Sequence, residues 1–336
     1  MIRIGVIGVG YWGPNLIRNL YKVEECSPVA VADVDPQRLA VMERLYPGLR
    51  TVAQAEEVLH APDVDAVVIA TPISTHFALA REALRSGKHV LVEKPMTATV
   101  AEGTALVDLA ETAGKILMVD HTFIYAGAVQ KIRGLIQAGE LGHIYYYDAV
   151  RVNLGLFQRD VNVLWDLASH DFSIMAYLLD KPPVSVQGVG AAPIHWDGWR
   201  QESIAYITME FADGTLAHFH VNWLTPVKIR RILIGGSRRT VIYDHLDPDN
   251  QVKIFDKGVE VLPEQERFHT LVQYRTGDML APKIEQTEAL ELVCRHFVEC
   301  VRHGRQPLTA GREGLQVVRL LEAAQRSMDE HTVVRL

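Results

Sequence analysis

The chain has 336 residues, of which 48% are hydrophobic and 22% charged, and its formal net charge is −7 at pH 7. This length and composition predict two well-packed domains and exclude a disordered chain. The negative charge and the lack of a long basic run argue against a nucleic-acid partner. The first strand begins almost at Met1 and no apolar run reaches the roughly 20 residues that span a bilayer, so we expect a cytoplasmic protein without membrane contact.

The N-terminal part of the chain alternates apolar strands with helices. We expect strands near residues 4–7, 29–32, 66–70, 89–92 and 116–119, with helices between them. A helix over 77–85 is expected to start after an N-cap at Ser74 or Thr75. This α/β pattern predicts a Rossmann domain with a doubly wound parallel sheet.

The pattern changes after residue 122. A helix over 128–138 is followed by several strands joined by short turns such as Asp213-Gly214 and Gly235-Gly236, which predicts an open, mostly antiparallel sheet. One helix near 163–179 interrupts these strands, and two amphipathic helices close the chain. The sequence therefore predicts a Rossmann domain over 1–122 and an α+β domain over 123–336, with the last helix a candidate for packing on the first domain.

A glycine-rich turn follows the first strand. Gly8 makes the turn, Gly10 leaves room for a pyrophosphate, and Gly13 allows close packing of helix and strand. The N-terminus of the following helix favours an anion. Asp33 ends the second strand 33 − 13 = 20 residues past the last glycine, where a carboxylate binds the ribose hydroxyls and repels a 2′-phosphate. The turn and Asp33 together predict NAD, in preference to NADP, as the cofactor.

Two further strands end in residues expected to border the cofactor, because ligands bind beyond the carboxyl ends of parallel strands. Thr71-Pro72, followed by His76, ends one strand, although His76 also fits a surface position in a first helical turn. Glu93-Lys94-Pro95 ends the next strand and would place Lys94 beside the nicotinamide. The alternative for Lys94 is a surface lysine at a strand end.

The second part of the chain holds another candidate pair. Asp166 and His170 lie four residues apart on a predicted helix, so they share a face, and the histidine can exchange a proton near neutral pH. The alternative is a capping aspartate with a solvated histidine.

Other polar groups suggest structural roles. His218 and His220 share a strand face, but the sequence offers no third zinc ligand, so we expect no metal. We expect reduced, packed side chains at Cys26, Cys294 and Cys300. Five cations cluster in the late strands: Lys228, Arg230, Arg231, Arg238 and Arg239. Their simplest interpretation is a solvated sheet edge, and the alternative is a basic rim that binds a diphosphate.

These motifs together resemble the Gfo/Idh/MocA oxidoreductases over essentially the whole chain. The resemblance implies a Rossmann domain, a second domain whose open sheet often mediates homo-oligomers (dimers or tetramers), and an active site between them. It implies that Lys94 orients and polarises the reacting hydroxyl, that His170 is the acid or base, and that Asp166 positions the substrate or the histidine. The Lys94-Pro95 peptide is often cis in such proteins. By this resemblance, cofactor contacts are expected from Gly8, Gly10, Tyr11, Trp12, Gly13, Asp33, Thr71, Pro72, His76, Glu93 and Lys94.

Within that family the chain looks similar to bacterial nucleotide-sugar 3-dehydrogenases of polysaccharide biosynthesis. The similar segments are Tyr11-Trp12-Gly13-Pro14-Asn15, Arg151-x-Asn153, Asn162-x-x-Trp165-Asp166 and Tyr274-Arg275-x-Gly277-Asp278. This similarity implies hydride transfer at C3 of a UDP-linked N-acetylglucosaminuronic acid, with substrate contacts from Lys94, Arg151, Asn153, Asp166 and His170.

Two alternatives remain open. One is an inositol, glucose or dihydrodiol dehydrogenase of the same family. The other is a non-catalytic NAD-binding regulator, against which the presence of both Lys94 and His170 argues, because a sensor needs neither.

Overall fold

The chain divides into two units. The structure is a computed structural model that describes residues 1–155, 157, 160–195, 198, 200–261 and 272–336. By their internal contacts, Met1–Tyr125 and Thr287–Glu322 form the first unit, and Ala126–Gln286 and Ala323–Leu336 form the second. The stretch Thr287–Glu322, which the sequence placed in the second domain, thus groups with the first unit.

The first unit is built on a six-stranded, fully parallel sheet in the order β3-β2-β1-β4-β5-β6. This order confirms the predicted Rossmann sheet. The three-residue strand β3 was not predicted, because it is too short to show a periodic pattern. The strands are β1 (Ile2–Ile7), β2 (Cys26–Ala32), β3 (Arg50–Val52), β4 (Ala66–Ile69), β5 (His89–Glu93) and β6 (Leu117–Asp120).

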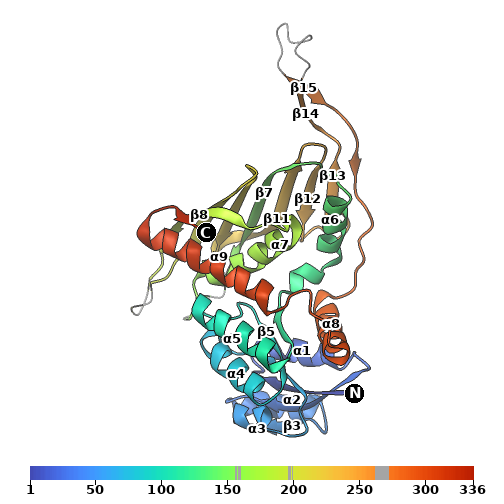
Figure 1. Cartoon of the computed structure of the whole chain (residues 1–336), viewed down its shortest axis with the longest axis vertical. Coiled ribbons are helices and arrows are strands. Elements are labelled where there is room, and N and C mark those ends of the chain that lie inside the picture. Colours follow the sequence, from blue (N-terminus) through green and yellow to red (C-terminus); the bar gives the residue numbers. More distant parts are fainter. Residues whose placement is uncertain (156, 158–159, 196–197, 199, 262–271) are drawn as a thin grey trace. The chain divides into compact units, whose positions relative to one another are not determined.

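Helices cover both faces of this sheet (Figure 1), with α4 and α5 packed together on one face and α1 and α8 on the other. The expected N-cap at Ser74 or Thr75 is wrong, since α4 starts at Ile73 and the Thr75 hydroxyl donates to the Pro72 carbonyl at 2.8 Å. The helices are α1 (Gly13–Leu20), α2 (Pro36–Leu45), α3 (Ala55–Leu59), α4 (Ile73–Arg85), α5 (Val100–Ala113), the 3-10 turn η1 (Thr122–Tyr125), α8 (Ala289–His303) and α9 (Gly311–Glu330), whose last residues belong to the second unit.

The second unit is built on a nine-stranded sheet in the order β16-β13-β12-β11-β7-β10-β9-β8-β17. All neighbours are antiparallel except β7 and β10, which are parallel because helical segments, and no hairpin, connect β7 to β8. The strands are β7 (Ile144–Leu154), β8 (Pro183–Ala191), β9 (Ile204–Phe211), β10 (Leu216–Asn222), β11 (Leu224–Gly236), β12 (Thr240–Asp244), β13 (Val252–Phe255), β16 (Met279–Leu280) and β17 (Val334–Arg335), with a separate hairpin of β14 (Gly258–Val261) and β15 (Val272–Arg275).

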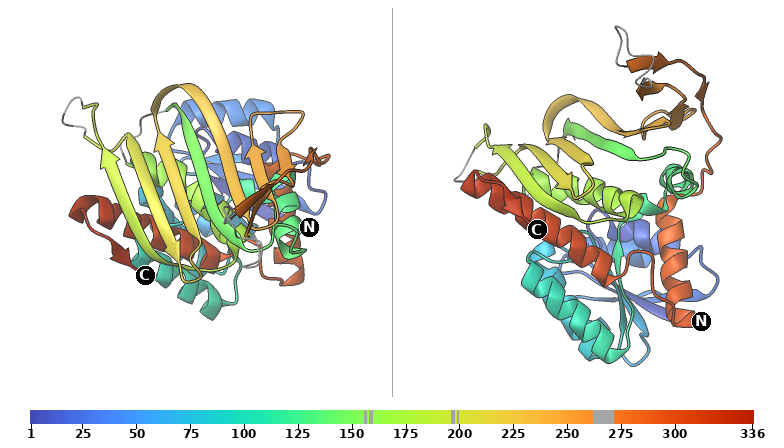
Figure 2. Two further views of the ribbon diagram at one scale, coloured as in Figure 1. Left: turned by 90° about the horizontal axis from the view of Figure 1, so that it is seen from above. Right: turned by 45° about the horizontal axis from the view of Figure 1, so that its top comes forward.

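Helices α6 (Gly127–Gln137) and α7 (Ser169–Leu179) lie on one face of this sheet (Figures 1 and 2). Phe172 of α7 packs edge-on against Phe219 of β10, with ring centroids 4.8 Å apart. The helix expected over 163–179 begins as a π-helical turn, η2 (Leu164–Ala168), and continues as α7. The core of the second unit therefore lies between this face of the sheet and the two helices.

Two expectations about strand β11 and the turn after it are wrong. Strand β11 lies between β12 and β7 inside the sheet, so the interpretation of Lys228, Arg230 and Arg231 as a sheet edge is wrong. Gly235 and Gly236 are the last residues of β11 and not the turn. The turn follows them and closes with a hydrogen bond of 3.0 Å from the Gly236 amide to the Arg239 carbonyl.

Two simpler expectations can also be compared with the structure. The three cysteines are buried and unbridged, as expected for packing residues. Within the part of the chain that the structure describes, no helix is long and apolar enough to cross a membrane.

Candidate active site

The glycine turn between β1 and α1 has the geometry that a dinucleotide needs. Gly8 has φ +91°, and a Cβ at Gly13 would lie 2.1 Å from the Gly8 carbonyl oxygen, so both positions require glycine. A Cβ at Gly10 would meet only the Arg38 guanidinium, at 3.6 Å. The space over Gly10 is therefore open at the N-terminus of α1, where a pyrophosphate fits.

Asp33 lies at the end of β2 beside this turn. Its Oδ2 accepts a hydrogen bond from the Val9 amide at 2.7 Å, and its Oδ1 accepts one from the Asp35 amide at 2.8 Å. Each carboxylate oxygen keeps lone pairs for the two ribose hydroxyls. The sequence did not single out Arg38, whose Nη1 lies 3.7 Å from Asp33 and which belongs to the residue type that accommodates a 2′-phosphate in NADP enzymes.

Replacing Asp33 by alanine is expected to raise the Kd for NAD at least about tenfold, because hydrogen bonds to a charged group each contribute about 1.5–3 kcal/mol. The Kd for NADP should change less, since the carboxylate no longer repels the 2′-phosphate and Arg38 remains. Titration of both nucleotides by protein fluorescence measures the ratio. Asp35→Ala is the matched control, because Asp35 caps α2 by accepting from the Gln37 amide at 2.8 Å. An equal loss of NAD affinity in both variants would refute the ribose assignment.

The loop after β4 is braced by His76. The imidazole is 1% exposed, with Nδ1 2.9 Å from the Pro95 carbonyl oxygen and Nε2 2.8 Å from that of Thr71. The surface interpretation of His76 is therefore wrong, since its ring ties the loop after β4 to the loop after β5. Cofactor contacts by Thr71, Pro72 and His76 stay predictions.

Lys94 is the first residue after β5, next to a buried pair of carboxyl groups. Glu93 and Asp120 lie opposite each other at the ends of β5 and β6, and both are buried. Burial and the neighbouring Asp120 hold the pKa of Glu93 well above its usual range, while the Lys94 cation opposes this rise. Burial likewise raises the pKa of Asp120, so both carboxyl groups are shifted towards the protonated form. The Lys94-Pro95 peptide is cis, as expected from the family resemblance.

His121 completes this cluster. It is 2% exposed, and burial together with the Lys94 cation lowers its pKa to about 3, so it is neutral at pH 7. The sequence did not single out Asp120 or His121, although the strand-end rule that selected Lys94 applies equally to β6. Lys94 thus lies at the carboxyl end of the sheet beside a neutral imidazole and two buried carboxyl groups with raised pKa values.

In the second unit, Asp166 lies in the π-helical turn η2 and His170 in the first turn of α7. The Asp166 carboxylate accepts a hydrogen bond of 3.1 Å from the indole Nε1 of Trp223, a fully buried residue just after β10. Asp166 is therefore held by a tryptophan that the sequence did not single out. At the start of this segment the Trp165 amide donates to the Asn162 side-chain oxygen at 3.1 Å, so the side-chain acceptor there is Asn162 and not Asp166.

Arg151 and Asn153 come from the end of β7. Arg151 is 4% exposed and binds the Asp171 carboxylate of α7 through two hydrogen bonds, of 2.9 Å and 2.8 Å. The Asn153 side chain donates to the Leu154 carbonyl at 3.0 Å. Substrate contacts by Arg151 and Asn153 stay predictions, and the ion pair shows that Arg151 fixes α7 on β7.

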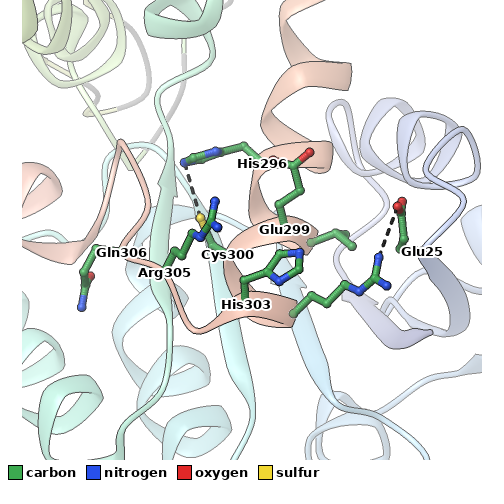
Figure 3. A pocket seen from close by; sticks show the side chains of 9 residues that line it. Glu25, His296, Glu299, Cys300, His303, Arg305 and Gln306 are labelled. Atoms are coloured by element: carbon green, nitrogen blue, oxygen red, sulfur yellow. Dashed lines mark hydrogen bonds and ion pairs between the residues drawn. The ribbon is translucent and has the colours of Figure 1, made fainter.

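Two other polar regions take no part in this site. A pocket of about 380 Å³ lies at the C-terminal end of α8, and no predicted site residue lines it (Figure 3). Two of its lining residues, Arg302 and Glu25, form an ion pair of 3.4 Å. His220 stacks on Tyr206 with ring centroids 4.4 Å apart. Among the residues that the structure describes, no group of three or more metal-binding side chains is gathered.

Comparison with known proteins agrees with this geometry. The chain belongs to the Gfo/Idh/MocA oxidoreductase family: residues 2–121 match its NAD-binding Rossmann domain and residues 133–336 its C-terminal alpha/beta domain. This confirms the family, the fold and NAD as the cofactor.

Individual relatives are dehydrogenases. The UDP-N-acetylglucosamine 3-dehydrogenase of Acidithiobacillus ferrooxidans is 31% identical over 265 residues, covering 78% of this chain and 79% of that protein. The scyllo-inositol 2-dehydrogenase (NAD(+)) of Bacillus subtilis is 28% identical over 322 residues, covering 91% and 88%. The solved structure of the dehydrogenase GnnA, from Acidithiobacillus ferrooxidans, gives a TM-score of 0.81 at 25% identity, over 98% of each chain.

Proposed function

We propose that the protein oxidises a ring hydroxyl at C3 of a nucleotide-linked sugar, or reduces the corresponding ketone, in the making of polysaccharide precursors. The observation that carries the proposal is Lys94 at the end of β5, in the unit that also presents the glycine turn and Asp33. The similarity to a UDP-N-acetylglucosamine 3-dehydrogenase supports a nucleotide-linked sugar.

Three side chains have separate roles in the proposed reaction. The glycine turn and Asp33 would hold NAD, which would supply the hydride donor or acceptor for the sugar carbon. The Lys94 ammonium donates a hydrogen bond to the reacting oxygen and stabilises its developing negative charge, an effect of roughly 3–4 kcal/mol where water is excluded. His170 accepts the hydroxyl proton, and Asp166, fixed by Trp223, positions the sugar or the histidine.

A second candidate substrate is a free polyol, favoured by the similarity to the scyllo-inositol dehydrogenase. Absorbance of reduced nicotinamide separates the two when the protein and NAD are mixed with UDP-sugars, dTDP-sugars, uronates, inositols and glucose. We expect reduction with UDP-sugars. Reduction with polyols alone would move the function to the second candidate, and NAD binding without turnover of any sugar or ketone would favour a regulator.

We further propose that the protein forms a homo-oligomer through the face of the nine-stranded sheet opposite α7. This face carries exposed apolar side chains such as Tyr206 and Leu216, which are 45% and 48% exposed. Burial of apolar area is the main favourable term in such association. Light scattering of the purified protein measures the assembly, and a monomer at micromolar concentration would contradict it.

A further inference from the structure

The candidate site residue Asp166 lies in the middle of the π-helical turn η2, which continues directly into α7. A π turn closes hydrogen bonds between residues i and i+5, so it holds one residue more than a turn of α-helix. Such turns are rare, and they occur frequently at functional sites. Because the α-helical form is far more common, contacts from neighbouring segments must select the π form, and with it the direction in which Asp166 points.

Asn162, a buried residue just before this turn, binds the turn with both its backbone and its side chain. The first amides of a helical segment need acceptors from outside the segment. The Asp166 amide donates to the Asn162 backbone carbonyl at 3.0 Å. The Trp165 amide donates to the Asn162 side-chain oxygen at 3.1 Å. Asn162 thus holds the amides of two successive residues of the turn, and the second of them is the candidate site residue.

A chain of hydrogen bonds between two carboxylates fixes the orientation of the Asn162 side chain. Its Nδ2 donates to the Glu202 carboxylate at 2.8 Å and to the Gln325 side-chain oxygen at 2.7 Å. The Gln325 nitrogen donates in turn to the Asp329 carboxylate at 3.0 Å. Because a carboxylate only accepts hydrogen bonds, the nitrogens of both amides point towards the carboxylates. The Asn162 oxygen is therefore left facing the Trp165 amide.

The segment Glu202-Ser203 also holds the tryptophan that binds the Asp166 carboxylate. The Glu202 carbonyl accepts a hydrogen bond from the Val163 amide at 3.0 Å. The Ser203 carbonyl accepts one from the Trp223 amide at 2.9 Å, and the Trp223 indole donates to Asp166 at 3.1 Å. The backbone before the π turn and the side chain that binds Asp166 are therefore attached to the same two residues.

We propose that Asn162 is a positioning residue for the reaction, which sets the direction of Asp166 through the π turn and does not itself contact the substrate. The proposal rests on the proposed function, in which Asp166 positions the sugar or His170. Asn162 must donate two hydrogen bonds and accept one, which neither a carboxylate nor a hydroxyl can do. Because a misplacement of about 1 Å can lower a reaction rate about a hundredfold, the requirement for an amide at this position is expected to appear in kcat.

The substitution Asn162→Asp tests this requirement with almost no change of side-chain volume. The carboxylate cannot donate to Glu202 or Gln325, so we expect the π turn to shift and kcat to fall about tenfold to a hundredfold. The double variant Asn162→Asp, Glu202→Gln lets the new amide donate to the new carboxylate, and it should recover a large part of the loss. Glu202→Gln alone should lower kcat less than Asn162→Asp does, because an amide oxygen still accepts from Asn162.

Two comparisons at saturating NAD and sugar separate positioning from a loss of stability. Asn19→Asp is the matched control, because Asn19 is also a buried asparagine that donates to a glutamate, Glu288 at 3.0 Å, but lies in the first unit. We expect it to lower the melting temperature and to leave kcat close to that of wild type. In an Asp166→Ala background, Asn162→Asp should add almost nothing to the loss of kcat, since a residue that acts through Asp166 then has nothing to position. Losses that multiply, or an equal loss of kcat in Asn19→Asp, would overturn the proposal.

A measurement without turnover separates this proposal from the proposed function. The indole N–H of Trp223 donates to Asp166, so its NMR signal reports the position of that carboxylate. We expect Asn162→Asp to move this signal towards its position in Asp166→Ala, and the addition of Glu202→Gln to bring it back. If the signal moves in this way but no sugar is oxidised, Asn162 positions Asp166 and the proposed reaction fails. If the signal in Asn162→Asp stays where it is in the wild type, the positioning role is overturned whatever the enzyme oxidises.

Discussion

Replacing Lys94 by methionine is expected to lower kcat for sugar oxidation about a hundredfold to a thousandfold, the cost of removing one donor to a developing oxyanion. Methionine keeps most of the apolar stem and removes only the charged donor. The Kd for NAD should stay within about tenfold of wild type, since the glycine turn and Asp33 supply the main contacts predicted for the nucleotide. Stopped-flow absorbance of the reduced nicotinamide measures the hydride-transfer step directly.

Lys94→Arg is the informative companion variant. It keeps the positive charge next to Glu93 and Asp120, but a planar guanidinium cannot place a single donor as an ammonium does. We expect a large loss of kcat here as well, with less effect on thermal unfolding than the methionine variant, which removes the cation beside the carboxyl pair. A kcat near that of wild type in Lys94→Met would exclude the role proposed for this residue.

The glycine turn was predictable because its requirements are local in the sequence. Gly8 has a positive φ, and a Cβ at Gly13 would lie 2.1 Å from the Gly8 carbonyl oxygen. Both requirements come from one tight turn, so they are visible as glycines at nearby positions of the sequence. Counting from the last glycine placed Asp33 at the end of β2, since one βαβ unit has a nearly fixed length, and the structure confirms that position. Asp120 was missed although it also ends a strand, because its importance comes from the neighbouring Glu93.

The second unit was predictable only in outline. Alternation of apolar residues indicated its strands, but nothing local shows that β7 is parallel to β10 or that β11 lies inside the sheet. The contacts around its candidate site residues join positions far apart in the chain, such as Trp223 with Asp166 and Arg230 opposite Arg151. Their importance depends on strand order, so a sequence read residue by residue does not reveal them.

The ion pair of Arg151 and Asp171 carries the second large expected effect. Both side chains are almost fully buried, and burial of a charge is costly unless a partner compensates it. Asp171→Asn leaves Arg151 without its counter-charge, opposite a second arginine. We expect the free energy of unfolding of the second unit to fall by about 3–5 kcal/mol.

The measurement is native-state hydrogen exchange at the amides of β7 and α7, which reports opening of the second unit by itself. Arg231→Ala breaks a half-exposed ion pair on the other face of the sheet and should cost no more than about 1 kcal/mol. The double variant Arg151→Met, Asp171→Leu replaces both charges by apolar groups and should recover most of the loss, since the cost comes from the unpaired cation. A loss below about 1 kcal/mol in Asp171→Asn would mean that water already reaches this pair.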